Sequence, residues 1–300
     1  MRVLNFGSVN IDHIYAVDHI VTPGETISVQ RLDYAAGGKG LNQSIALAKT
    51  GIETFHAGCI GSDGHMMSEL LKKNHVSTLY LRTCDTVTGH AVIQVNTDGQ
   101  NSIMILGGAN QAISLEQVQN TLSNFTEKDS ILMQNEISHV NEIAEMCYDR
   151  HIPLFFNPSP ITPQLLETFP FKYVSCLLIN ETEAHDITSE SEPQSIINYF
   201  LSHYPQMQVV LTLGSKGVIF ADKESQIHQP AFHVEAVDTT AAGDTFTGYY
   251  MGSYLQGASV KNALLYGCAA AALAVTKKGA APSIPEKAEV EQFLKMHNNG

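Results

Sequence analysis

Short apolar runs typical of buried strands alternate with helical patterns along most of this 300-residue chain. The strand-like runs are Arg2–Gly7, Thr54–Cys59, Ser130–Gln134, Leu154–Asn157, Leu177–Asn180 and Val209–Leu213, and the helical patterns include Ile45–Lys49 and Met66–Lys73. The alternation predicts a three-layer α/β/α fold, with a mostly parallel central sheet and helices on both faces. In such sheets, ligands bind at the carboxyl ends of the strands. Asn157, Asn180 and Thr212 fall at strand ends, so we expect their side chains to face a binding cleft.

Two segments interrupt the alternation, His13–Ala36 and Gly89–Leu106. In the second segment, two strand-like stretches are joined by a turn at Asp98 and Gly99. We expect both segments to contribute strands to a small separate sheet; an ordinary surface hairpin is the alternative. No shift in composition, repeat or low-complexity tract divides the chain, so the sequence predicts one α/β domain, residues 1–300, with this small sheet attached.

The composition argues against several kinds of partner. A net charge of −13 offers no basic face for nucleic acid, and a polyphosphate ligand would have to arrive with a metal ion. The longest apolar run, around Cys268–Val275, is too short to cross a membrane. The five cysteines are scattered without metal-ligand spacing, and polar residues interrupt the N-terminal apolar run, unlike in a signal peptide. We therefore expect a cytoplasmic protein with reduced thiols.

The segment VDTTAAGDTFTGYYMG, Val237–Gly252, runs from a polar loop through small residues into an apolar helix. Ala241, Ala242 and Gly243 let backbone N–H groups come close to a ligand, and the helix start adds partial positive charge. A carboxylate in such an anion-binding turn would repel phosphate, but Asp244 could take the proton of a nucleophilic hydroxyl. The segment therefore predicts a phosphoryl-transfer site with Asp244 as general base. A carboxylate that only stabilises the helix start is the alternative.

A second glycine-rich segment, Ala35–Gly51, places GGKG before a helix of small and apolar residues, and two such turns indicate two ligands. Together the two segments resemble the signature motifs of the ribokinase-like carbohydrate kinase family. Further motifs match that family in order along essentially the whole chain: NID (Asn10–Asp12), TPGET (Thr22–Thr26), GGAN (Gly107–Asn110), MQNE (Met133–Glu136), NPSP (Asn157–Pro160), NETEA (Asn180–Ala184), TLGSKG (Thr212–Gly217) and TKKGAAPS (Thr276–Ser283).

The resemblance implies a ribokinase-like fold and an ATP-dependent sugar kinase. The expected reaction is phosphorylation of D-ribose at its 5-hydroxyl, which gives D-ribose 5-phosphate and ADP. The small sheet, from segments of about 13–36 and 89–106, would form a lid over the sugar and pair with the lid of a second subunit. Deoxyribose, fructose or a nucleoside are alternative substrates. A non-catalytic sugar or nucleotide sensor is a further alternative, although a pure binder gains nothing from a carboxylate beside phosphate.

A sugar site needs dense hydrogen bonding from carboxylates and amides, because sugars present many hydroxyls. The residues that the resemblance assigns to the sugar are Asn10, Asp12, Gly38, Lys39, Gly40, Asn42, Glu136 and Asp244. In the family, the residues matching Asp12 and Asn42 bind ring hydroxyls, and the match of Glu136 reaches the anomeric side. The alternatives are a polar turn for Asn10 and Asp12 and an exposed charge for Lys39.

The residues that the resemblance assigns to MgATP are Asn180, Glu183, Thr212, Gly214, Ser215, Gly217, Ala242, Gly243 and Cys268. Asn180 and Glu183 would organise Mg²⁺ through its bound waters, with a helix-capping asparagine as the alternative. Gly214 and Gly217 would let the backbone approach phosphate or ribose, and Cys268 would pack beside the adenine.

The resemblance also implies a K⁺ site next to the anion-binding turn. Its proposed ligands are the carboxylate of Asp238, backbone carbonyls and the hydroxyl of Ser283, in the set Asp238, Thr240, Ala274, Lys277, Gly279 and Ser283. Such oxygen ligands suit a large, hard cation. Two other nucleotide-binding folds are disfavoured, because neither G-x-G-x-x-G after the first strand nor the P-loop pattern G-x-x-x-x-G-K-[ST] occurs.

Overall fold

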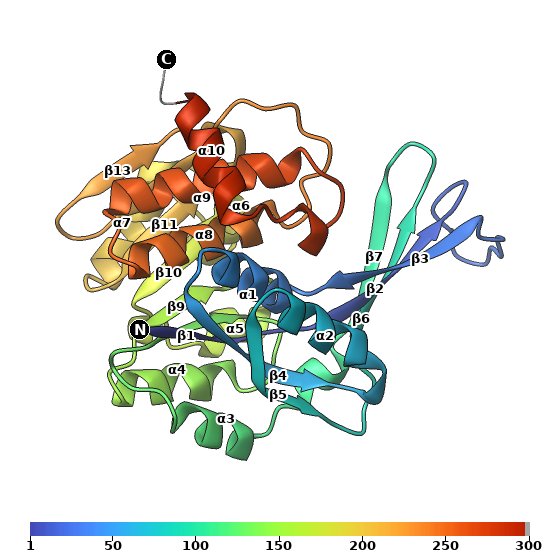
Figure 1. Ribbon diagram of the computed structural model, residues 1–300, viewed down its shortest axis with the longest axis horizontal. Helices are drawn as coiled ribbons and strands as arrows, with labels where there is room; N and C mark the ends of the chain where they lie inside the picture. Colours follow the sequence, from blue (N-terminus) through green and yellow to red (C-terminus); the bar gives the residue numbers. More distant parts are fainter. Residues whose placement is uncertain (298–300) are drawn as a thin grey trace.

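The computed structural model describes residues 1–297 and contains a sheet of nine strands and a second sheet of four (Figure 1). In spatial order the large sheet consists of β13 (Gln226–Gln229), β12 (Val218–Ala221), β11 (Gln208–Thr212), β10 (Cys176–Asn180), β9 (Leu154–Asn157), β8 (Ser130–Gln134), β1 (Arg2–Phe6), β4 (Glu53–Ile60) and β5 (Val76–Thr83). The pairs from β11 to β5 are parallel, and β12 and β13 add antiparallel strands at one edge. The predicted mostly parallel sheet is confirmed.

Helices cover both faces of the large sheet (Figure 1). They are α1 (Lys39–Lys49), α2 (His65–Lys73), α3 (Leu115–Leu122), α4 (Val140–Asp149), α5 (Pro163–Thr168), α6 (Glu181–Thr188), α7 (Pro193–His203), α8 (Ala242–Leu255), α9 (Val260–Val275) and α10 (Lys287–His297). Within residues 1–297, no helix combines the length and the apolar composition needed to cross a membrane.

The strand side chains alternate between the two helical layers. Leu4 and Phe6 of β1 belong to the core under α3, α4, α6 and α7, whereas Val3 packs on the side of α8 and α9. In β8, Met133 packs on the side of α3, α4, α6 and α7, and Leu132 packs on the side of α8 and α9. Because both faces are buried, these strands are nearly continuous apolar runs, which is why the sequence marks them clearly.

The four-stranded sheet has the order β3 (Arg31–Gly37), β2 (Asn10–Ala16), β6 (Gly89–Val95) and β7 (Asn101–Leu106), and it projects from the main body (Figure 1). The expected small sheet is therefore present, and we call it the lid. Strand β2 begins at Asn10, three positions before the predicted boundary at His13. Asn10 and Asp12 consequently lie in a strand, so the alternative of a polar turn is wrong for them.

Close backbone contacts at glycines hold α1 against β1 and α8. A Cβ atom on Gly40 would lie 2.4 Å from Gly7 Cα, and one on Gly248 would lie 2.3 Å from Ala46 Cβ. No side chain fits in gaps of this size. The N-terminal turns of α1 and α8 are thereby brought side by side, at the edge where the parallel strands end.

Candidate active site

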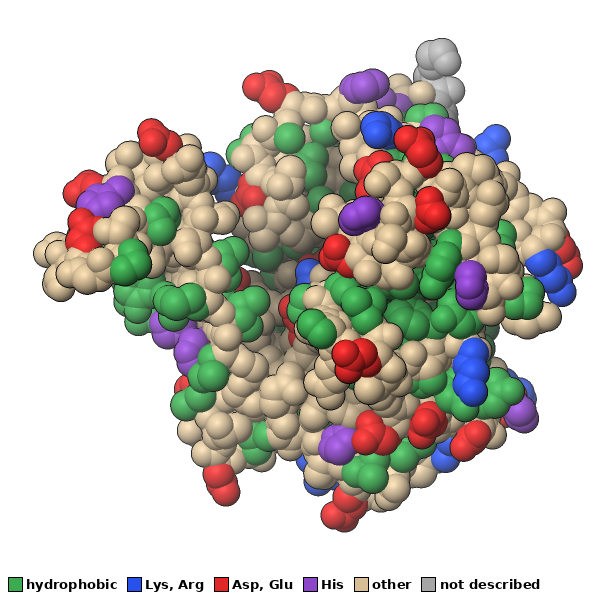
Figure 2. All heavy atoms as spheres, turned by 180° about the vertical axis from the view of Figure 1, so that it is seen from behind, with side chains coloured by type: hydrophobic (Ala, Val, Ile, Leu, Met, Phe, Trp, Pro, Cys, Tyr) green, Lys and Arg blue, Asp and Glu red, His purple; other side chains and the backbone are tan. Residues whose placement is uncertain are grey.

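A cavity of about 270 Å³ opens at the carboxyl ends of β9, β10 and β11, beside the start of α8. Its lining residues are Lys39, Asn157, Leu178, Ile179, Asn180, Glu183, Thr212, Thr239, Ala241, Ala242, Gly243, Asp244 and Thr247. Figure 2 shows the surface hollowed between the lid and the main body. The three strand-end residues Asn157, Asn180 and Thr212 all line the cavity, as expected for side chains at the carboxyl edge of a parallel sheet.

Asp244 is held by two neighbouring amides of α1. It is the third residue of α8, and only 9% of its surface is exposed. Asn42 Nδ2 donates to Asp244 Oδ2 over 3.0 Å, and Gln43 Nε2 donates to Asp244 Oδ1 over 2.9 Å. The carboxylate therefore has a defined orientation at the wall of the cavity.

The expected tight turn is present at the start of α8, but not all of its backbone N–H groups are free to bind a ligand. Ala241 has a φ of 58°, in the left-handed region, and the Ala242 N–H donates to the Thr239 carbonyl over 3.2 Å. That bond occupies one of the three N–H groups, those of Ala241, Ala242 and Gly243, that the sequence analysis placed beside the anion. A Cβ atom on Gly243 would meet nothing within 4 Å. Gly243 is therefore the position of this turn where a phosphate oxygen could come closest to the backbone.

Lys39 is surrounded by carboxylates. Burial lowers the pKa of its ammonium, but the charges of Asp244, Glu136 and Glu183 outweigh that effect, so the pKa of Lys39 is raised. Its backbone N–H also donates to Glu136 Oε2 over 3.2 Å. Lys39 is thus a half-buried cation that lines the cavity, and the alternative of an exposed charge at a helix start is wrong.

Asp12 and Glu136 are half-buried acids on the lid side of the site. Burial raises the pKa of Asp12 to about 6, and the nearby Glu136 adds to the shift. Burial also raises the pKa of Glu136, although hydrogen bonds from the Ser8 hydroxyl and the charge of Lys39 oppose it. A Cβ atom on Gly37 would lie 2.3 Å from the Asp12 carboxyl group, so this glycine packs directly against the acid.

Two asparagines of the predicted sugar site differ in whether the side-chain oxygen already accepts a hydrogen bond. Asn10 Oδ1 accepts from Asn110 Nδ2 over 2.8 Å, while Asn110 Oδ1 accepts from the Val9 N–H over 2.9 Å. The last residue of the GGAN motif thus anchors the start of β2. Asn42 Oδ1, in contrast, is a buried acceptor without a hydrogen-bond partner among the described residues. Buried acceptors are nearly always paired, so this atom is a place for a ligand donor.

Asn180 and Glu183 form a reciprocal cap on α6. Asn180 Oδ1 accepts from the Glu183 N–H over 2.8 Å, and Glu183 Oε2 accepts from the Asn180 N–H over 3.2 Å. The capping alternative for Asn180 is therefore real, and it coexists with a place on the cavity wall. No cluster of three or more His, Cys, Asp and Glu side chains within residues 1–297 could cage a metal ion. The two oxygen donors fit Mg²⁺, which keeps several waters and binds substrate phosphates.

Gly214 and Gly217 belong to the same turn, but packing excludes a side chain only at Gly217. Gly217 has a φ of 102°, and a Cβ atom there would lie 2.1 Å from the Gln229 carbonyl of β13, so packing alone requires glycine. Gly214 also has a positive φ but faces open space, and Ser215 follows it in the same 3-10 turn. Cys268 lies buried in α9 within the core under α8, outside the lining of the cavity.

The two loops of the predicted K⁺ site meet in the structure. Asp238 Oδ1 accepts from the Thr240 N–H over 2.9 Å, and Asp238 Oδ2 accepts from the Gly279 N–H over 2.9 Å. Burial raises the pKa of Asp238, but the hydrogen bond from the Thr240 hydroxyl, the two backbone hydrogen bonds and the charge of Lys278 outweigh it and lower the pKa overall. Ser283 Oγ is fully buried and donates to the Ala280 carbonyl over 2.7 Å. Carboxylate, carbonyl and hydroxyl oxygens, the kinds of donor that these two loops carry, fit a hard cation.

Three residues that interact with the predicted site were missed in the sequence. Gln43 and Thr247 flank Asp244 from α1 and α8, and Ser8 donates to the Glu136 carboxylate. A polar residue directly after the first apolar run is a weak signal for Ser8. Gln43 and Thr247 lie inside helices whose sequence pattern says nothing about the partner across the cavity.

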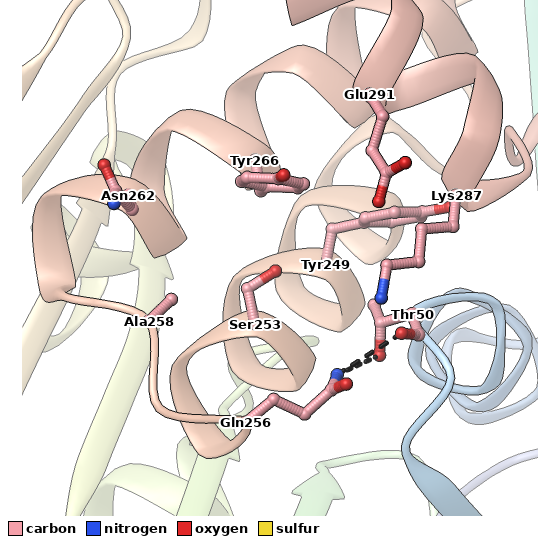
Figure 3. Close-up of a pocket in the computed structure, with 9 residues that line it drawn as sticks. All are labelled: Thr50, Tyr249, Ser253, Gln256, Ala258, Asn262, Tyr266, Lys287 and Glu291. Carbon is pink, nitrogen blue, oxygen red and sulfur yellow. Dashed lines mark hydrogen bonds between the residues drawn. The ribbon is translucent and has the colours of Figure 1, made fainter.

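A second cavity, of about 310 Å³, lies over the C-terminal half of α8 rather than at its start. Tyr249, Ser253, Tyr266, Lys287 and Glu291 are among its lining residues. Figure 3 shows Lys287 and Glu291 reaching over it from α10. It contains none of the residues that hold or surround Asp244, so we place the candidate active site in the first cavity.

Comparisons with known proteins agree with this geometry. The model of the pfkB family of carbohydrate kinases matches residues 2–287. The chain is 36% identical over 297 residues to a ribokinase of Haemophilus influenzae, with 96% of each chain covered. Its structure is similar to that of an Arabidopsis thaliana ribokinase complexed with ribose and ATP, with a TM-score of 0.86, 32% identity and 98% of each chain covered. A deoxyribokinase of Salmonella typhi is 28% identical, with 99% of this chain and 100% of that protein covered.

Proposed function

The chain belongs to the pfkB family of carbohydrate kinases and is an ATP-dependent sugar kinase, and we propose that its sugar is D-ribose. The reaction transfers the γ-phosphoryl group of ATP to the 5-hydroxyl of ribose and gives D-ribose 5-phosphate and ADP. Identity to ribokinases at 36%, against 28% to a deoxyribokinase, favours ribose over deoxyribose. Fructose and nucleosides are weaker candidates, and a non-catalytic sensor does not account for the fixed Asp244.

The observation that carries the proposal is the position of Asp244 between two groups of polar residues. Lys39 and Asn42 approach it from α1, and Asn180 and Thr212 line the same cavity from the strand ends. A sugar on one side and a nucleotide on the other would meet at this carboxylate. In-line phosphoryl transfer needs that arrangement, because its catalysis is mostly positioning and electrostatic stabilisation.

Asn42 links the sugar to the base. Its Nδ2 donates to Asp244, while its Oδ1 is buried without a partner among residues 1–297. A sugar hydroxyl would satisfy this oxygen, and Asp12 and Glu136 supply further acceptors nearby. A ligand lacking the matching hydroxyl would leave a buried acceptor unpaired, which typically costs about 1–3 kcal/mol. This pairing supports selection of the sugar by its hydroxyl pattern.

In the proposed mechanism, Asp244 accepts the proton of the attacking hydroxyl as the phosphoryl group is transferred. The Gly243 N–H and the α8 dipole stabilise negative charge that develops on the phosphoryl oxygens. The ammonium of Lys39, which lines the same cavity, offsets the charge of the phosphates and of the surrounding acids. Asn42 and Gln43 keep the carboxylate oriented during the transfer.

ATP would lie along Asn180, Glu183, Thr212 and the turn that starts at Gly214. Mg²⁺, when bound, supplies positive charge between the phosphates, and Asn180 and Glu183 would hold its waters. K⁺ would bind between the loops joined by Asp238 and Gly279, which we propose supports the start of α8. Its ligands would be the predicted set of Asp238, Thr240, Ala274, Lys277, Gly279 and Ser283.

We also propose a single α/β domain with its lid, a homodimer formed through the lids, and a cytoplasmic location. The lid exposes several large apolar side chains, which supports pairing with a second lid. None of the five cysteines, all within the described range, forms a disulfide, and this is consistent with reduced thiols in the cytoplasm.

A sugar-panel kinase assay tests the proposed function. The purified protein is incubated with MgATP and KCl and with ribose, 2-deoxyribose, fructose or a nucleoside, and ADP release is followed. We expect the highest kcat/KM for ribose. A preference for another sugar would assign a sister activity, and no turnover with any sugar would favour the sensor.

The Asp244→Asn variant separates chemistry from binding. We expect activity to fall below a few per cent of wild type, while ribose and ATP affinities stay within about tenfold, because the general base is lost and the pocket is kept. Turnover assays and calorimetric titrations measure the two effects. Substantial activity in this variant would remove Asp244 from its proposed role.

A further inference from the structure

A chain of buried amides leads from Asp244 into the interior of the protein. Gln43 donates from Nε2 to Asp244 Oδ1 over 2.9 Å and to Asn157 Oδ1 over 3.0 Å. Its Oε1 accepts from Gln134 Nε2 over 2.6 Å, and the same nitrogen of Gln134 donates to Asn5 Oδ1 over 3.0 Å. Gln43 and Gln134 are 0% and 1% exposed, so water does not compete for these hydrogen bonds.

The far end of the chain returns to α1. Asn5 Nδ2 donates to the Gly40 carbonyl over 2.8 Å and to Ser44 Oγ over 2.9 Å. The chain therefore ties β1 and β8 to the helix that carries Asn42 and Gln43. An ionised carboxylate only accepts hydrogen bonds, so Asp244 requires Gln43 to present its NH₂ group and to turn its oxygen toward Gln134.

We propose that Gln43 is the residue that positions Asp244 for proton abstraction, an inference that rests on the proposed kinase reaction. Asn42 holds the other carboxylate oxygen, but in the proposed site its free acceptor Oδ1 also serves the sugar. Gln43 has no such second task, because Asn157 of β9 and Gln134 of β8 fix its amide. The carboxylate is thereby aligned with the strand ends that line the cavity.

A buried glutamine could also serve the fold alone, and Gln117 provides a matched control. It is 4% exposed on α3, donates from Nε2 to the Gly58 carbonyl over 2.9 Å, and accepts from Cys59 Sγ over 3.1 Å. It does not line the cavity. Equal substitutions at Gln43 and Gln117 therefore compare the loss of a buried amide with and without contact to Asp244.

The experiment measures kcat, ribose KM, nucleotide affinity, thermal unfolding and the kcat–pH profile for Gln43→Met, Gln43→Glu, Gln117→Met and Gln117→Glu. We expect Gln43→Met to lower kcat by about tenfold or more while KM and nucleotide affinity change by less than about threefold, since a transition-state interaction is lost. In Gln43→Glu, two carboxyl groups face each other and share a proton. The acid limb of the kcat–pH profile, where kcat falls as the pH is lowered, should therefore move to higher pH. Lys39 and Glu136 are the charged groups near Asp244, and Glu183 lies near Lys39; all three are unchanged in every variant.

The Gln117 variants should unfold at lower temperature but keep the wild-type kcat and acid limb. A Gln43→Met enzyme with kcat within about twofold of wild type, or a Gln43→Glu enzyme with the wild-type acid limb, would overturn the assignment. If Gln43→Met does not fold, the profile of Gln43→Glu decides alone, because glutamate matches glutamine in shape. A wild-type protein without sugar kinase activity would instead contradict the proposed function.

Discussion

At the scale of single residues, Asp12 predicts a pH dependence of sugar binding. Its pKa is raised to about 6, chiefly by burial and then by Glu136. The ionised carboxylate is a stronger acceptor for a sugar hydroxyl than the protonated acid is, so the ribose KM should fall as the pH rises through about 6. Measuring KM across this range for wild type and Asp12→Asn tests the assignment. The variant should bind ribose more weakly, and its KM should no longer change with pH in this range.

The same shift has a consequence for stability. Because the folded state holds the Asp12 proton more tightly than the unfolded state does, protonation stabilises the fold. That contribution is complete below the unfolded pKa of about 4 and is lost as the pH rises through about 6. Asp12→Asn should therefore flatten the dependence of unfolding free energy on pH in this window. An unchanged slope would mean that Asp12 titrates normally.

Sequence patterns could identify Asp244 but not its supports. The small-residue turn and the carboxylate lie within four consecutive positions, so their chemistry is visible locally. Gln43 and Asn157 are 114 positions apart, and Ser8 and Glu136 are 128 apart. Such contacts depend on how strands and helices assemble. The resemblance supplied the sugar and nucleotide residues, and their individual roles stay predictions until variants are measured.

At the scale of elements, Gly248→Ala should separate α1 from α8. The new Cβ atom would lie 2.3 Å from Ala46 Cβ and 2.7 Å from the Leu47 nitrogen, so the helices must move apart. Overpacking of this kind costs about 1–3 kcal/mol of unfolding free energy. Activity should fall further than stability suggests, because Asn42 and Gln43 would move away from Asp244. Ser253→Ala, on the same helix, should change neither quantity appreciably.

The loop elements around Asp238 predict activation by a monovalent cation. We expect K⁺ to raise kcat strongly and Na⁺ weakly, because occupancy between the loops would fix Thr240 and the start of α8. Asp238→Ala should abolish the response to K⁺, and it also removes the hydrogen bonds from Thr240 and Gly279. Rates are compared in KCl, NaCl and a bulky organic chloride at constant ionic strength. Equal rates in all three salts would refute the site.

The elements differ in how clearly their sequences show them. Strands β1, β4, β8, β9, β10 and β11 were predicted within one residue at each end, because burial on both faces makes them largely apolar. The edge strands β5 and β13 are largely half-buried or exposed, and their mixed sequences VSTLYLRT and QIHQ gave no clear signal. Strand β12 is short, and its pairing depends on Gly217 fitting against Gln229.

At the scale of the whole molecule, the lid is the part that cannot bury its own apolar surface. Its edge strand β7 exposes four consecutive large side chains, Ile103, Met104, Ile105 and Leu106, each by half or more. Neighbouring residues of a strand point to opposite faces, so both faces of the lid are apolar at this edge. Patches of this kind on a projecting sheet are typical of an interface.

The double variant Ile103→Lys with Met104→Lys tests the proposed homodimer by placing a charge on each face of β7. We expect sedimentation velocity to show a dimer for wild type and a monomer for the variant, because lysine would be buried without a partner in a lid-to-lid contact. Leu79→Lys is the matched control, since Leu79 is 72% exposed on β5 of the large sheet and lies outside the lid. The monomeric variant should also bind ribose more weakly, because an isolated lid has less to hold it over the sugar. A wild-type monomer would show that the lid covers the site without a second subunit, and a variant that stays dimeric would show that the dimer forms through another surface. In either case the apolar edge of β7 would need another explanation.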